Sequence, residues 1–241
     1  MEEKFLRFTD EYDKTDENVR SKIAHTMRVK TNMHDVAVEL GFSDDEVQLA
    51  TEIGLLHDTG RFDQAEQAKT FNDYKSFDHA EHGADLLFKE GLIEKFGIKR
   101  EHYPAIEFAI RQHNKLKIEK NEDALSMKMA KLVRDVDKLD ILYNFGTLGR
   151  FNLKGDDSDI CARVMEDIMN CRCVDRKFAT TNNEKIAADF AFVFDLNYTI
   201  SLEVAKERLK VLYERVEYKD TFKNIYEHAI KYLNERIEKQ C

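Results

Sequence analysis

The sequence has no tryptophan, a single proline and only nine glycines among its 241 residues. Proline and glycine supply most of the tight turns between strands, so their scarcity argues against a sheet-rich fold. Charged residues make up 35% of the chain and hydrophobic residues 42%, which is typical of amphipathic helices around a common core. We therefore predict an all-α protein, and its length fits a single domain over residues 1–241.

A long basic surface is also missing. The formal net charge is −9 at pH 7, the isoelectric point is about 5.5, and no dense cluster of lysine and arginine is interleaved with aromatics. Nucleic-acid polymers are bound largely through their phosphates, so we expect no such polymer as a partner. A small phosphorylated molecule stays compatible, because one buried metal ion and one or two local cations can bind it against an acidic overall charge.

No run of about 18 apolar residues occurs, and the N-terminal stretch MEEKFLRFTDEYDK lacks the apolar core of a signal peptide. The four cysteines lie in the last third of the chain, where Cys171 and Cys173 lack the C-x-x-C spacing of a zinc site or redox pair. These absences predict a cytoplasmic protein without a membrane segment, whose cysteines are free thiols.

A histidine and an aspartate stand side by side at the end of an apolar stretch. Leu55 and Leu56 precede His57 and Asp58 on a predicted helix that begins with a capping-box sequence, SDDE. Gly60 then lets the chain turn away. Two buried polar groups cost free energy unless partners satisfy them, and a divalent metal ion is one of the few partners able to satisfy both.

Further histidine and aspartate residues lie near the apolar faces of the neighbouring predicted helices. They are His25 on the helix over residues 16–40, His79 in the first turn of the helix that begins at residue 78, His113 at the end of the helix that begins at residue 104, and Asp137 on the helix over residues 124–144. Imidazole and carboxylate groups suit Mn, Fe, Co, Ni, Zn or Mg ions. Because no thiolate is among them, a closed structural zinc site is disfavoured.

Three stretches carry a resemblance to a known family. HDTGRF, DHAEHGADLL and RDVDKLD, in this order on successive predicted helices, resemble the motifs of the HD-domain superfamily of metal-dependent phosphohydrolases. The resemblance covers about residues 20–145, and the residues after 145 resemble nothing that we can name. It implies an HD-domain helical bundle, with additional C-terminal helices over about residues 146–241.

The resemblance also implies a ligand set for one or two divalent metal ions. The first metal site would use His25, His57, Asp58 and Asp137. In members with two ions the aspartate of the HD pair bridges them and two further histidines bind the second ion, here His79 and His113. His82, one turn after His79, is an alternative ligand for that second site.

The activity that the resemblance implies is hydrolysis of a small phosphomonoester or phosphodiester, such as a nucleotide or a related metabolite. Hydroxide on the metal would attack phosphorus, and Asp58, Asp137 and Arg61 are the expected catalytic residues. Asp137 or Asp140 would orient the water or accept its proton, and Arg61 would bind the substrate phosphate. Two alternatives stay open, an HD-fold di-iron oxygenase and a non-catalytic metal-binding regulatory module.

Other parts of the sequence have simpler interpretations. The polar residues 60–77 predict a long loop over the site. His34, His102 and His228 have no partner in the ligand pattern, and we expect them at the surface. The aromatic residues after Gly146 are expected in the core and in subunit contacts, which leaves a homo-oligomer open.

Overall fold

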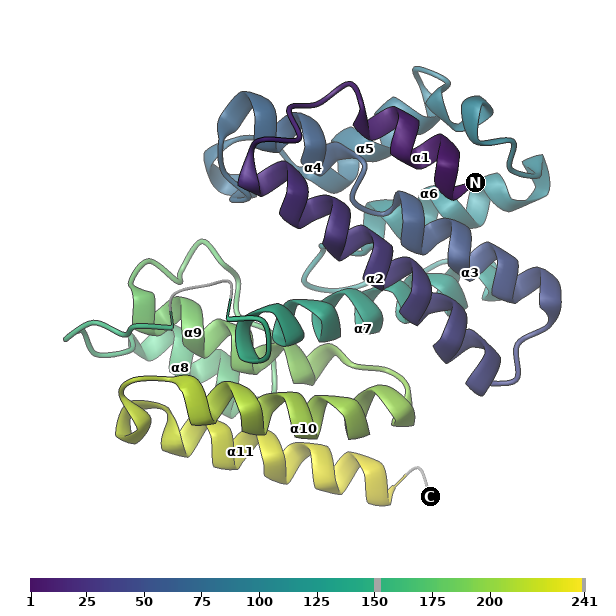
Figure 1. The fold of residues 1–241 in the computed structure, drawn as a ribbon. Coiled ribbons are helices and arrows are strands. Elements are labelled where there is room, and N and C mark those ends of the chain that lie inside the picture. The colour runs from purple at the N-terminus through teal and green to yellow at the C-terminus, as the bar shows by residue number, and fades with distance from the viewer. Residues whose placement is uncertain (150–152, 240–241) are drawn as a thin grey trace. The chain divides into compact units, whose positions relative to one another are not determined.

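The computed structural model describes residues 1–149 and 153–239, and in these residues it contains helices and no strands (Figure 1). The prediction of an all-α fold is confirmed. Within residues 1–149 and 153–239, none of the helices combines the length and the hydrophobicity that a membrane span requires. Cys161, Cys171 and Cys173 form no disulfide, and Cys241 lies outside the described residues.

The chain divides into two compact units, Met1–Arg134 and Asp135–Cys241. The division falls inside α7 (Ala124–Gly146), a helix that starts in the first unit and ends in the second. The organisation suggested by the sequence, one domain with an extension after residue 145, stays a prediction.

The first unit holds the residues from which the sequence predicts a metal site. Before α7 its elements are α1 (Glu2–Thr9), α2 (Glu17–Glu39), α3 (Asp44–Leu56), α4 (Gly60–Asp63), the π-helical turn η1 (Gln64–Ala68), the 3₁₀ turn η2 (Asp73–Lys75), α5 (His79–Phe88), the 3₁₀ turns η3 (Leu92–Phe96) and η4 (Arg100–His102), and α6 (Tyr103–Gln112). Helix α2 packs along α3, α5 packs on α6, and α3 also contacts α6, so the predicted ligands are carried by helices that touch one another.

Local capping explains where these helices begin. The Asp16 carboxylate accepts a hydrogen bond from Asn18 N at the beginning of α2. At the beginning of α3, Ser43 and Glu46 form the reciprocal capping box that the sequence predicts. Asp78 accepts hydrogen bonds from the first backbone amides of α5. At these predicted helix starts, backbone amides of the first turn therefore have the side-chain acceptors that they need.

The segment over residues 60–77, which we predicted to be a loop, is helical in its first half, where it forms α4 and η1. The reason is burial. Phe62 is fully buried, and the rings of Phe5, Phe8 and Tyr12 lie 5.4 to 5.8 Å from its ring centroid. This aromatic cluster holds α1 over α4 and gives the first turns after the HD pair a packed apolar face.

Two glycines let α4 and α5 touch through their backbones. A Cβ atom on Gly60 would lie 2.3 Å from the carbonyl oxygen of His79 and 2.7 Å from the amide nitrogen of Gly83. A Cβ atom on Gly83 would lie 2.8 Å from Gly60 N. Any larger residue at either position would force apart α4, which follows the HD pair, and α5, which begins at His79.

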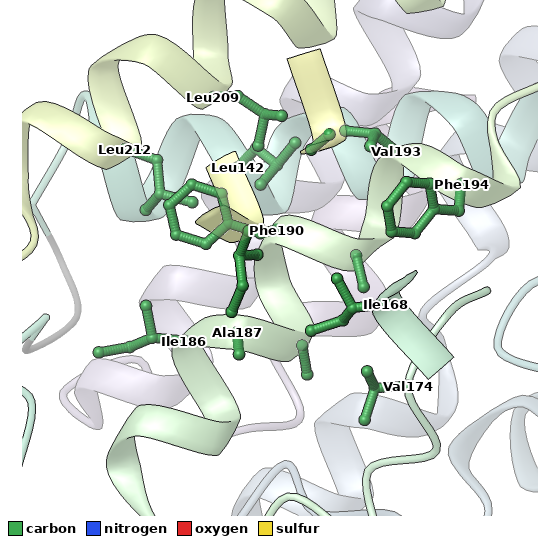
Figure 2. Packing of buried hydrophobic residues seen from close by; sticks show 14 of the residues in the cluster. Leu142, Ile168, Val174, Ile186, Ala187, Phe190, Val193, Phe194, Leu209 and Leu212 are labelled. Atoms are coloured by element: carbon green, nitrogen blue, oxygen red, sulfur yellow. The ribbon is translucent and has the colours of Figure 1, made fainter. Parts of the chain in front are cut away.

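The second unit has its own hydrophobic core. Its elements are the end of α7, then α8 (Ala162–Met169), α9 (Asn182–Phe190), the 3₁₀ turn η5 (Ala191–Asp195), α10 (Thr199–Arg215) and α11 (Lys219–Glu238). Figure 2 shows side chains of these elements meeting around Phe190, among them Ile168 of α8 and Leu209 and Leu212 of α10.

Gly60→Ala is expected to lower the free energy of unfolding by about 1–3 kcal/mol or more, because the added methyl group must displace backbone atoms. Thermal or urea unfolding measures the change. Gly146→Ala is the matched control, since its Cβ would meet its nearest atoms at 3.4 Å and alanine favours the helix. Equal stability of Gly60→Ala and the wild type would contradict the close contact.

Candidate metal centre

The HD pair lies where α3 ends. His57 is the C-cap residue of α3, and its side chain and that of Asp58 are almost completely inaccessible to solvent. The last turn of α3 is apolar and buried, so the helix carries both polar groups into the interior. The expected inward orientation of the pair is therefore what the structure shows.

One pair of histidines faces one oxygen of Asp58. His25 of α2 and His57 are both buried, and their Nε2 atoms lie 3.3 Å apart. The Oδ2 atom of Asp58 lies 3.4 Å from His25 Nε2 and 3.6 Å from His57 Nε2. These three side chains form a group whose donor atoms can share one metal ion.

A second pair of histidines faces the other oxygen of Asp58. His79, in the first turn of α5, and His113, just after α6, have their Nε2 atoms 3.0 Å apart. The Oδ1 atom of Asp58 lies 3.4 Å from His79 Nε2 and 3.6 Å from His113 Nε2. This second group of buried potential ligands shares Asp58 with the first.

Hydrogen bonds on the far side of the rings fix which nitrogen faces the cluster. His57 Nδ1 lies 2.9 Å from the carbonyl oxygen of Gly54, and His113 Nδ1 lies 2.7 Å from that of Ile110. A carbonyl only accepts, so Nδ1 carries the proton and the Nε2 of the neutral ring keeps its lone pair. The third such ring, His79, places Nδ1 2.8 Å from the Asp73 carboxylate, with the same consequence.

The facing Nε2 atoms show whether the cluster suits a metal ion. The Nε2 atoms of His79 and His113 lie 3.0 Å apart, and in neutral rings protonated at Nδ1 both of these nitrogens would be acceptors. Two facing acceptors repel unless a cation lies between or beside them. Neutral imidazole nitrogens held from behind, together with a shared carboxylate, are the donor set that divalent transition metals prefer. The cluster fits such an ion.

The charge of Asp58 is compensated by a residue that the sequence reasoning missed. Burial raises the pKa of the Asp58 carboxyl, but Lys22 and the neighbouring imidazoles lower it more, and the net pKa lies well below its usual value. Lys22 Nζ lies 2.7 Å from Asp58 Oδ2. A lysine three residues before His25 shares its helix face, and that spacing was the available signal.

Arg61, the expected phosphate ligand, is largely engaged within its own segment. Its Nη1 donates to the carbonyl oxygen of Phe71 at 2.8 Å and to Asp73 Oδ1 at 2.9 Å, and it also contacts Gln64. Its Nε lies 3.7 Å from Asp58 Oδ1, and no atom of the described residues accepts a hydrogen bond from it. The phosphate-binding role stays a prediction, with Nε as its available donor.

His82, His34 and His102 are not in the two groups that share Asp58. His82 Nε2 lies 2.6 Å from Asp63 Oδ2, so His79 and not His82 belongs to the cluster around Asp58. His34 is exposed, as expected. The surface position that we expected for His102 is wrong, because its side chain is 2% exposed and its Nδ1 lies 2.7 Å from Glu52. A buried glutamate on α3 holds it, which spacing alone does not reveal.

Asp137 lies on the part of α7 that belongs to the second unit, so the structure does not place it relative to the cluster. Its role as a ligand stays a prediction. The same is true of Asp140 as a water-orienting residue. Lys138, another cation on this helix, lies 2.9 Å from Asp195 within the second unit.

Protonation of His79 is expected to destabilise the metal-free protein. Burial lowers its pKa from 6.5 to about 3, so the unfolded chain takes up a proton that the folded chain excludes. The free energy of unfolding should therefore fall by up to about 1.4 kcal/mol per pH unit as the pH drops from 6.5 towards 3. Urea unfolding of wild type and His79→Gln at several pH values measures this, and parallel profiles would contradict it.

Comparison with known proteins agrees with this geometry. The sequence model of the HD domain family matches residues 23–145, which is just over half of the chain. No curated protein and no solved structure matches. The matched residues include both histidine pairs and the aspartate between them. The chain therefore belongs to the HD domain family, whose members are mostly metal-dependent phosphohydrolases that bind divalent metal ions.

Proposed function

We propose that the protein is a metal-dependent phosphohydrolase that cleaves a small phosphomonoester or phosphodiester. The observation that carries this proposal is the position of Asp58, whose two oxygens face two different pairs of imidazole nitrogens. A carboxylate shared in this way suits a pair of cations better than one. A purely structural ion needs only one of the two groups.

The residues that would hold the ions follow from the two groups. His25, His57 and Asp58 would bind the first ion, with Asp137 as the proposed additional ligand, and Asp58, His79 and His113 would bind the second. A bound divalent ion would supply a water of lowered pKa and neutralise charge on the phosphoryl oxygens.

The protein's own part is to orient these groups and to bind the phosphate. Lys22 is next to Asp58 Oδ2, and Arg61 Nε is the nearest guanidinium nitrogen to Oδ1. The lysine ammonium sits on a flexible stem and can exchange the carboxylate for a phosphate oxygen once a divalent ion neutralises Asp58. We propose that Lys22 and Arg61 bind the substrate phosphate, and that Asp137 or Asp140 orients the attacking water.

The proposed substrate is small. The net charge of −9 opposes the approach of a polyanion, whereas two local cations suffice for one phosphate group. A nucleotide or a related phosphorylated metabolite is proposed on the basis of family membership.

Asp58→Asn is expected to remove both metal and activity. The amide keeps the size of the side chain but loses the charge and one of the two acceptor oxygens, so one group loses its oxygen ligand and neither keeps a negative charge. Because a metal ion contributes several kcal/mol to transition-state stabilisation, kcat/KM should fall by about 10³-fold or more. Metal analysis of protein purified without chelators, followed by phosphate release from nucleotides and simple phosphate esters, measures both effects.

Two variants serve as controls in the same assays. His34→Ala lies on α2 like His25 but is exposed, and should leave metal content and rate unchanged. Lys22→Gln should keep the metal and raise KM, which separates phosphate binding from metal binding. Oxygen-dependent turnover by an iron-loaded protein, without anaerobic hydrolysis when manganese is bound, would contradict the proposal, and so would full activity after chelation.

A further inference from the structure

We infer that Asp73 is a positioning residue that orients His79 and so determines whether the second metal ion binds. The inference rests on the metal binding proposed above and adds a regulator of that site. Asp73 lies in η2, outside the sequence motifs, and no sequence pattern pointed to it.

Both oxygens of Asp73 face the imidazole of His79. The distances from His79 Nδ1 are 2.9 Å to Oδ1 and 2.8 Å to Oδ2. The ring is buried, and its other nitrogen lies in the cluster with His113 and Asp58. The carboxylate therefore controls both the tautomer of His79 and the direction of the Nε2 lone pair.

Asp73 is itself firmly held. Arg61 Nη1 and Gln64 Nε2 each donate to Oδ1 at 2.9 Å, and Asn114 Nδ2 approaches Oδ2 at 3.3 Å. Two of these donors come from the helical turns after the HD pair, and the third follows His113. The hydrogen bonds tie the η2 segment to both sides of the second histidine pair.

The neighbouring carboxylate of Asp78 has other partners. Its Oδ1 accepts hydrogen bonds from Ala80 N and Glu81 N at the beginning of α5, and its Oδ2 lies 2.8 Å from Lys115 Nζ. Capping and ion pairing thus occupy Asp78. Asp73 is the carboxylate that serves the imidazole of His79.

The histidines differ in the hydrogen-bond partner of Nδ1. His57 and His113 each donate to a backbone carbonyl three residues earlier, a partner that the helix itself provides. His79 instead depends on a side chain from a separate segment. A carboxylate partner makes an imidazole a stronger metal donor, and losing such a partner typically costs 10–100-fold in metal affinity. The second pair should therefore be far more sensitive than the first to one substitution at position 73.

Asp73→Asn tests the inference through metal binding. Calorimetric titration with Mn²⁺ should show the affinity for the second ion reduced by about 10–100-fold, with the first ion bound as in the wild type. Electron paramagnetic resonance at two equivalents of Mn²⁺ should change from a spin-coupled pair to isolated ions. Asp73→Glu should restore part of the second-ion affinity, because it returns a carboxylate.

The matched control is Asp63→Asn. Asp63 Oδ2 also pairs with a histidine of α5, His82 at 2.6 Å, but that pair lies outside the two metal-binding groups. This variant should bind both ions like the wild type. Circular dichroism melting of each metal-free variant shows whether the helices remain folded, so a loss confined to the second ion is not general unfolding.

The outcomes separate the two proposals. A wild type that binds no metal contradicts the proposed function, and the role of Asp73 falls with it. A wild type that binds metal, with Asp73→Asn titrating identically, overturns the inference about Asp73 and leaves the proposed function intact. Equal losses in Asp63→Asn and Asp73→Asn also overturn it, since the effect would not be specific to His79.

Discussion

The buried charge of Asp58 is the constraint on which the rest of the first unit depends. An ionised carboxylate almost without access to water is costly unless neighbours compensate it. Here Lys22 provides an ammonium group, and imidazole nitrogens surround both oxygens. Without a divalent ion, Lys22 makes the largest single contribution to this compensation. When a divalent ion is bound, the Asp58 carboxylate would be one of its ligands, and the surrounding helices already hold the other ligands in place.

The fold assembles this centre from residues of several helices that pack on one another. One histidine pair comes from α2 and α3, and the other comes from α5 and the residue after α6, so the cluster joins segments far apart in the sequence. Gly60 and Gly83 allow the backbone contact between α4 and α5. Aromatic packing of α1 on Phe62 stabilises α4, the helical turn that follows the HD pair. Hydrogen bonds behind the rings then direct the lone pairs inward, which limits the reorganisation that metal binding requires.

Much of this could be predicted from the sequence because helical period, caps and the HD motif are local signals. Helices α2, α3 and α5 begin where their capping residues predict, and His25, His57, Asp58, His79 and His113 are brought together. The features that the sequence did not predict depend on tertiary contacts. Asp73 contacts His79 from the 3₁₀ turn η2, and buried His102 pairs with Glu52 of α3. The turns after Gly60 are helical because aromatic side chains of α1 cover them. Periodicity carries no information about such partners.

The two oxygens of Asp58 are expected to face two cation positions. Anomalous diffraction at the manganese edge, from crystals grown with Mn²⁺, tests it most directly. Two anomalous peaks are expected, one within bonding distance of Asp58, His25 and His57, and the other within bonding distance of Asp58, His79 and His113. Density showing Lys22 still paired with Asp58, and no peak at either histidine pair in crystals saturated with the ion, would contradict it.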